Sequence, residues 1–117
     1  MAETWKELIA SGARFVTSNL VLAETLTRLR YDVGHRRALE FYGLAVEAEE
    51  KKLLVVEYVD RELFGKGWEI FRDFVDQVFS ITDCTSFAVC KKLGVKRVLA
   101  LDRDFAIMGF EVLPPLS

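Results

Sequence analysis

The sequence predicts an α/β domain of three layers, in which a short, mainly parallel sheet is flanked by helices. Stretches with helical periodicity alternate along the chain with short apolar runs, and glycines, prolines or charged residues separate the two kinds of segment. This alternation is typical of parallel sheets, because parallel strands need long crossover connections that are usually helical. At 117 residues the chain fits one domain spanning 1–117.

The N-terminal half is expected to supply three helices and two strands. Thr4 and Glu7 have the spacing of a capping box, and Gly12 can end the short helix that follows. Thr17 or Ser18 can cap the second helix. The expected elements are a helix between 4 and 12, a strand over 14–17, a helix from about 18 to 31, a helix over 35–51 and a strand over 53–56 that is covered on both faces.

The apolar positions of these helices predict which side chains are buried. Glu24 lies well away from the centre of the apolar face of the second helix and is therefore not a core residue. That face consists of Val21, Leu22, Thr25, Leu26 and Leu29, and the third helix is expected to bury Leu39, Tyr42 and Val46.

The C-terminal half is expected to contain two further helices and two strands. Asp60 can cap a helix whose aromatic residues belong to the core, and Thr82 is the expected cap of a helix over 83–93 that ends at Gly94. A buried strand over 98–101 ends at Asp102. The remaining expectations are the apolar helix positions Leu63, Gly67, Ile70, Phe71, Phe74 and Val75, a helical turn over 105–108, and a last strand over 110–113 that Pro114 and Pro115 terminate.

Composition indicates a globular protein without a strong excess of positive or negative charge. Apolar residues make up 51% of the chain, which is enough for a packed core. No apolar run approaches the roughly 20 residues of a membrane-spanning helix, and residues 1–5 lack the layout of a signal peptide, so we expect a soluble, cytoplasmic protein. The net charge of −2 does not indicate a nucleic-acid binder. Contact with RNA would need a local basic patch, for which the candidates are Arg28, Arg36, Arg37, Lys91, Lys92, Arg97 and Arg103.

Cys84 and Cys90 are expected to be free thiols. On one helix they would be separated by about 9 Å of axial rise, beyond the roughly 7 Å between Cα atoms that a disulfide tolerates. With His35 as the one histidine, zinc is disfavoured.

Three acidic residues stand where a parallel sheet places its ligands, beyond the carboxyl ends of the strands. Glu24 lies early in a helix that follows a strand, Asp83 opens a helix and Asp102 closes a strand. Carboxylates are natural ligands of Mg²⁺ or Mn²⁺. Each also has a structural explanation: Glu24 can pair with Arg28, Asp83 can interact with a helix dipole, and Asp102 can form a turn.

Two segments resemble conserved blocks of PIN domains, a nuclease family that includes VapC-type toxins. They are VTSNLVLAETLTRLR (16–30) and SITDCTSFAVCKKLGVKRVLALDRDFAIMGFEVLPP (80–115). The resemblance implies that Glu24, Asp83 and Asp102 are metal ligands, that Asp104 competes with Asp102 for its place, and that Thr82 supports the site. It further implies cleavage of RNA with Mg²⁺ or Mn²⁺, with Arg28 and Arg103 as candidates for contact with the RNA.

One departure from the family pattern bears on activity. PIN domains usually begin with a central strand that carries an Asp, and this sequence opens at the helix that would follow that strand. We therefore expect an N-terminally shortened PIN-like domain whose first central strand is missing, either because the start codon is placed too far downstream or because the protein is a naturally shortened or degenerate member. The sheet would compensate by rearrangement, strand exchange or a dimer contact, since unpaired backbone groups are costly to bury.

The resemblance also implies partners, and two other functions compete with the nuclease. VapC-type proteins usually form homodimers and bind a small antitoxin through an apolar groove, which Trp5, Phe64 and Trp68 could line, although core packing is expected for at least two of them. The alternative is a shortened, catalytically impaired module that acts in oligomerisation or antitoxin binding. A phosphoacceptor domain is disfavoured, because the acidic pair and the lysine it requires are not evident.

Overall fold

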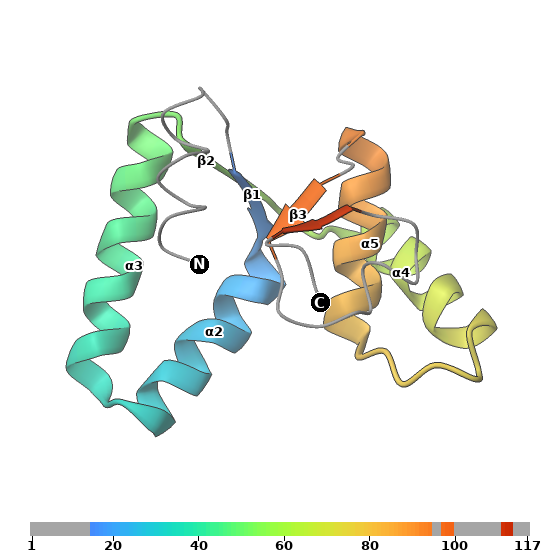
Figure 1. Ribbon diagram of the computed structural model, residues 1–117, viewed down its shortest axis with the longest axis horizontal. Coiled ribbons are helices and arrows are strands. Elements are labelled where there is room, and N and C mark those ends of the chain that lie inside the picture. The colour runs from blue at the N-terminus through green and yellow to red at the C-terminus, as the bar shows by residue number, and fades with distance from the viewer. Residues whose placement is uncertain (1–14, 95–96, 100–110, 114–117) are drawn as a thin grey trace. The chain divides into compact units, whose positions relative to one another are not determined.

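The computed structural model describes residues 15–94, 97–99 and 111–113 (Figure 1). These residues fall into two compact units, which divide in the sequence between Tyr58 and Val59. Each unit contributes one pair of parallel strands and one pair of helices, so the described part of the chain has the predicted α/β composition. None of the described helices is long and apolar enough to cross a membrane.

The first unit runs strand, helix, helix, strand. It consists of β1 (Phe15–Ser18), α2 (Asn19–Asp32), α3 (His35–Glu50) and β2 (Leu54–Glu57). The strands pair in parallel, with Phe15 opposite Leu54 and Ser18 opposite Glu57. Of the two predicted candidates, Thr17 and Ser18, it is Ser18 that caps α2, because its side chain accepts a hydrogen bond of 3.2 Å from the backbone N of Val21. The carboxyl end of β1 thus leads directly into α2, which carries Glu24.

The helices α2 and α3 form an antiparallel hairpin joined by a tight turn at Gly34 (Figure 1). Gly34 has φ 105° and ψ 164°, a conformation that essentially only glycine adopts. The turn can therefore be this short because residue 34 has no side chain.

The burial predicted for α3 is wrong at two of its three positions. Leu39 and Tyr42 are 61% and 47% exposed, whereas Ala38 and Ala45 are buried and Val46 is half-buried as predicted. The buried stripe precedes the predicted one by a single residue, which is about 100° around a helix. Two apolar stripes overlap in this sequence, and the one with small alanines allows closer packing against the neighbouring elements.

The strand β2 also differs from its prediction, because Val55 is exposed and the strand is not covered on both faces. In contrast, the predicted apolar face of α2 is correct. Each of its five residues is half-buried, and Glu24 is exposed.

The second unit consists of α4 (Arg61–Asp73), α5 (Ile81–Leu93), β3 (Arg97–Leu99) and β4 (Glu111–Leu113). The two strands pair in parallel, with Arg97 opposite Glu111. Asp60 caps α4 as predicted, since its Oδ1 accepts a hydrogen bond of 2.9 Å from the backbone N of Leu63. Gly94 ends α5 as predicted, in the left-handed conformation with φ 69°.

The core of this unit is centred on α5. Cys84, Thr85 and Phe87 have no exposed surface, and Phe87 contacts Phe79 edge to face with 5.1 Å between ring centroids. From α4, Leu63 packs against Ala88 and Val89 on one side, and Ile70 packs beside Phe79 and Phe87 on the other.

The prediction that the aromatic residues of α4 belong to the core is wrong. Only a narrow stripe of α4 reaches α5, with Leu63 and Gly67 buried and Ile70 half-buried. The helix also ends at Asp73, before the last two predicted apolar positions. The exposed residues are Phe64, Trp68, Phe71, Phe74 and Val75, and the rings of Trp68 and Phe71 stack with centroids 5.7 Å apart.

Several predictions fall outside the described residues. They are the helix between 4 and 12 with Trp5, the end of the strand over 98–101, Asp102, Arg103, Asp104, the helical turn over 105–108, and the terminating prolines.

Candidate active site

Glu24 lies on the second turn of α2 with half of its side-chain surface exposed. The predicted pair with Arg28 is present, but Glu24 Oε1 and Arg28 Nη2 are 3.9 Å apart and Arg28 is 74% exposed. An exposed pair of this length contributes at most about 1 kcal/mol. The carboxylate of Glu24 is therefore accessible and only weakly held, as a ligand position requires.

Asp83 occupies the third position of α5 and belongs to a capping box with Ser80. The backbone N of Asp83 donates to Ser80 Oγ at 3.0 Å, and the backbone N of Ser80 donates to Asp83 Oδ2 at 3.3 Å. The interaction with the helix N-terminus that the sequence allowed is thus present. Asp83 Oδ1 has no hydrogen-bond partner among the described residues.

The prediction that Thr82 caps this helix is wrong. The cap is Ser80, two residues earlier, and α5 begins at Ile81. Thr82 is half-buried, and its backbone carbonyl accepts hydrogen bonds from Thr85 Oγ1 at 2.8 Å and Ser86 Oγ at 2.9 Å. These hydroxyl contacts fix the first turn of α5, whereas the orientation of Asp83 comes from Ser80.

The meeting of the carboxylates at one metal site stays a prediction. Glu24 belongs to the unit that precedes Tyr58 and Asp83 to the unit that follows it. Within residues 15–94, 97–99 and 111–113, no three His, Cys, Asp or Glu residues form a metal-binding group. The third predicted ligand, Asp102, and its competitor Asp104 lie outside these ranges.

A shallow hollow of about 360 Å³ lies along α2 beside Glu24. Among the described residues it is lined by Ala23, Glu24, Thr27, Arg28 and Tyr31. Glu24 and Arg28 were predicted from the sequence as site residues, whereas Tyr31 was not. Its spacing of seven residues from Glu24, which places both on one face of a helix, is the signal that could have found it.

The two cysteines are free thiols, as predicted, and neither lines the hollow beside Glu24. Burial raises the pKa of the Cys84 thiol, and the neighbouring Asp83 charge raises it further. Burial also raises the pKa of Cys90. Both thiols are therefore protonated at neutral pH and poor nucleophiles.

Comparison with known proteins decides the family. The model of the PIN domain matches residues 1–111. The chain belongs to the PIN-domain family. It is 36% identical over 113 residues to the 23S rRNA-specific endonuclease VapC20 of Mycobacterium tuberculosis, in strains H37Rv and CDC 1551. The match covers 96% of this chain and 83% of VapC20.

A solved structure agrees with the sequence match. The crystal structure of VapC20, described as a sarcin–ricin loop cleaving toxin, superposes with a TM-score of 0.77 at 36% identity. The superposition covers 90% of this chain and 78% of the VapC20 chain. The predicted resemblance and the PIN-like α/β fold are thereby confirmed, and the prediction of a VapC-type endoribonuclease is supported.

Proposed function

We propose that this PIN-domain protein is a divalent-metal-dependent endoribonuclease of the VapC type, which hydrolyses RNA phosphodiester bonds as the toxin of a toxin–antitoxin pair. The observation that carries the proposal is the 36% identity to an RNA-specific endonuclease across 96% of the chain. The exposed carboxylate of Glu24 and the Oδ1 atom of Asp83, which is unbonded among the described residues, add chemical support.

Glu24, Asp83 and Asp102 are the proposed ligands, with Asp104 as the competitor of Asp102. The donor set fits Mg²⁺ or Mn²⁺, because both cations prefer carboxylate oxygens, and Glu24 is exposed while Asp83 keeps Oδ1 unbonded among the described residues. A bound cation would lower the pKa of water and offset charge on the phosphoryl oxygens. The capping box with Ser80 fixes the orientation of Asp83, and Thr82 supports the same helical turn. Arg28 and Arg103 would hold the phosphate backbone of the RNA.

The substrate is proposed by analogy with VapC20, a 23S rRNA-specific endonuclease and sarcin–ricin loop cleaving toxin. An RNA stem-loop with the sarcin–ricin sequence is therefore the first substrate to test. Specific cleavage of this loop by the chain, with an unrelated stem-loop left intact, would support the analogy.

Asp83→Asn is the decisive substitution. The amide oxygen of the substituted side chain can still accept the hydrogen bond from the backbone N of Ser80, so the capping box survives while the charge is lost. We expect cleavage in Mg²⁺ or Mn²⁺ to fall by about 100-fold or more, the scale on which metal sites respond to altered ligation.

Asp60→Asn is the matched control, because Asp60 caps α4 through a similar hydrogen bond. Cleavage rates of the three proteins are compared on the same labelled stem-loop. Equal activity of the wild type and Asp83→Asn would remove the nuclease proposal and leave the catalytically impaired binding module.

A protein partner is supported by the exposed aromatic face of α4, formed by Phe64, Trp68 and Phe71. Exposed apolar surface of this kind is typical of protein interaction sites. We assign this face to an antitoxin helix or to a second copy of the chain in a homodimer.

A further inference from the structure

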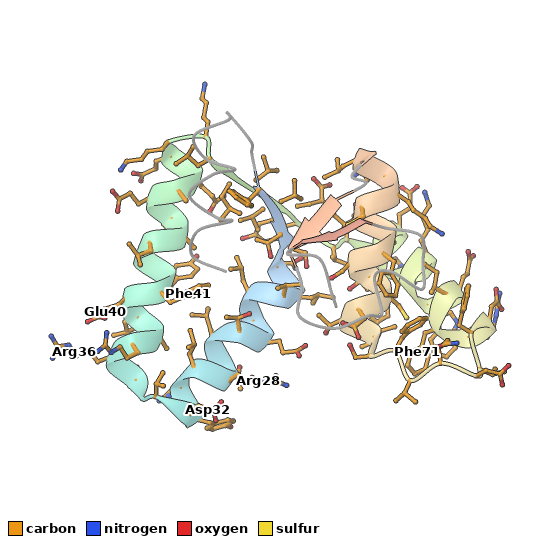
Figure 2. All side chains as sticks on the ribbon, in the orientation of Figure 1. Arg28, Asp32, Arg36, Glu40, Phe41 and Phe71 are labelled. Atoms are coloured by element: carbon orange, nitrogen blue, oxygen red, sulfur yellow. The ribbon has the colours of Figure 1, made fainter. Side chains whose placement is uncertain are left out.

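Positive charge gathers where α2 turns into α3, although the whole chain carries a net charge of −2. Arg28, Asp32, Arg36 and Glu40 surround this end of the hairpin (Figure 2). Between 28 and 40 the sequence holds four arginines against two acids, namely Arg28, Arg30, Arg36 and Arg37 against Asp32 and Glu40. The local excess gives this end of the hairpin a basic character that the overall net charge does not reveal.

Arg28 differs from the arginines of α3 in how it is held. Glu40 engages both Arg36, with Nε to Oε1 at 3.2 Å, and Arg37, with Nη1 to Oε2 at 3.5 Å. Arg28 is 3.9 Å from Glu24 and extends from α2 on the side away from α3 (Figure 2). Its guanidinium can therefore turn to a phosphate without breaking a short ion pair.

Tyr31 is 82% exposed on the same helix and lines the same hollow as Glu24 and Arg28. The three residues follow one another at intervals of four and three, so they form a stripe on one face of α2. From Glu24, the stripe advances by about 6 Å to Arg28 and about 10 Å to Tyr31. An exposed ring beside an exposed guanidinium is the combination that binds single-stranded RNA, with the ring stacking on a base and the cation on the backbone.

We propose that the RNA strand runs along this stripe of α2, with Arg28 on a phosphate and Tyr31 stacked on an unpaired base. Stacked nucleotides advance by about 3.4 Å each, so Tyr31 meets a base about three nucleotides from the phosphate next to Glu24. The inference rests on the proposed function and adds to it the residue that recognises a flanking base.

The test measures RNA affinity separately from cleavage. Binding of a fluorescein-labelled sarcin–ricin stem-loop is followed by anisotropy in EDTA, with the Asp83→Asn chain as the parent. Tyr31→Ala should weaken binding about 5- to 100-fold, the loss expected from one stacked base, and Tyr31→Phe should restore it. Arg28→Ala should weaken binding and reduce the slope of log affinity against log salt concentration by about 1.

Matched controls come from the same hairpin. Tyr42→Ala removes an exposed tyrosine of α3 that does not line the hollow, and Lys51→Ala removes a cation that pairs with Glu47 at 2.8 Å. Both should bind within about twofold of the parent, as expected for exposed positions outside the contact.

Outcomes for the inference and for the proposed function are distinguishable. If Arg28→Ala and Tyr31→Ala bind the stem-loop like the parent, the inference is overturned, while cleavage by the wild type would still uphold the nuclease. If Tyr31→Ala changes the oligomeric mass of the protein and leaves its RNA affinity unchanged, the inference is overturned as well, because Tyr31 would then belong to a protein interface. The inference is also overturned if the parent Asp83→Asn chain does not bind the stem-loop measurably.

Discussion

Two glycines of α4 that are two residues apart have different surroundings. A Cβ built on Gly67 would lie 2.7 Å from Thr85 Cγ2 and 3.0 Å from both Thr85 Cα and N, whereas one built on Gly65 would meet nothing within 4 Å. Because two of these three atoms are backbone, the close approach of α4 and α5 depends on the missing side chain at Gly67.

Gly67→Ala should therefore destabilise the protein and Gly65→Ala should stabilise it. Overpacking costs about 1–3 kcal/mol, and alanine recovers about 1 kcal/mol of helix propensity, so Gly67→Ala should lower the free energy of unfolding by up to about 2 kcal/mol. Gly65→Ala should raise it by about 0.5–1 kcal/mol. Urea denaturation measures both. Equal stability of the two variants would contradict the close helix contact.

At the level of the element, local rules were enough to predict the helices and strands of the described residues, but they predicted the buried face correctly for α2 and not for α3 or α4. The caps Asp60 and Gly94 were predicted correctly, and Ser18 was one of two predicted candidates, because capping depends on neighbours in sequence. The buried face of α3 was not predicted correctly, since Ala38 and Leu39 both belong to apolar stripes and the choice between them depends on distant elements. The aromatic residues of α4 show the same effect, because their helical spacing predicted burial whereas the packing of α4 against α5 leaves them exposed.

The cap of α5 shows a conflict between two local signals. Both Ser80 and Thr82 can cap a helix, but only Ser80 has an acidic residue three positions later, Asp83, to complete the box. Ser80→Ala should lower the free energy of unfolding by about 1 kcal/mol, and Thr82→Ala should change it less, because both hydrogen bonds of the box remain. Thermal or urea unfolding tests this. A larger loss for Thr82→Ala would make Thr82 the structural residue instead.

For the whole molecule, the sequence predicts Glu24 and Asp83 as ligands of one cation, and this stays a prediction. The two residues belong to separate units, and a shared site would depend on how distant segments pack, which no local pattern encodes. The family blocks propose both residues as ligands, because each block carries its acidic residue at a fixed place on a helix. The local settings support that proposal, since Glu24 is half exposed and Asp83 Oδ1 is unbonded among the described residues.

If the carboxylates of the two units share a cation, that cation must stabilise the folded chain. A ligand that binds only the folded state at about 100 times its Kd adds about 2.7 kcal/mol, which corresponds to a rise in Tm on the order of 10 °C. We expect Mg²⁺ or Mn²⁺ to raise the Tm of the wild type and of Asp60→Asn, measured by calorimetry against EDTA. Glu24→Gln and Asp83→Asn should each lose most of this rise, because one neutralised ligand weakens the whole site. Rises equal to that of the wild type in both variants would mean that Glu24 and Asp83 do not hold the same ion, whatever the chain does to RNA.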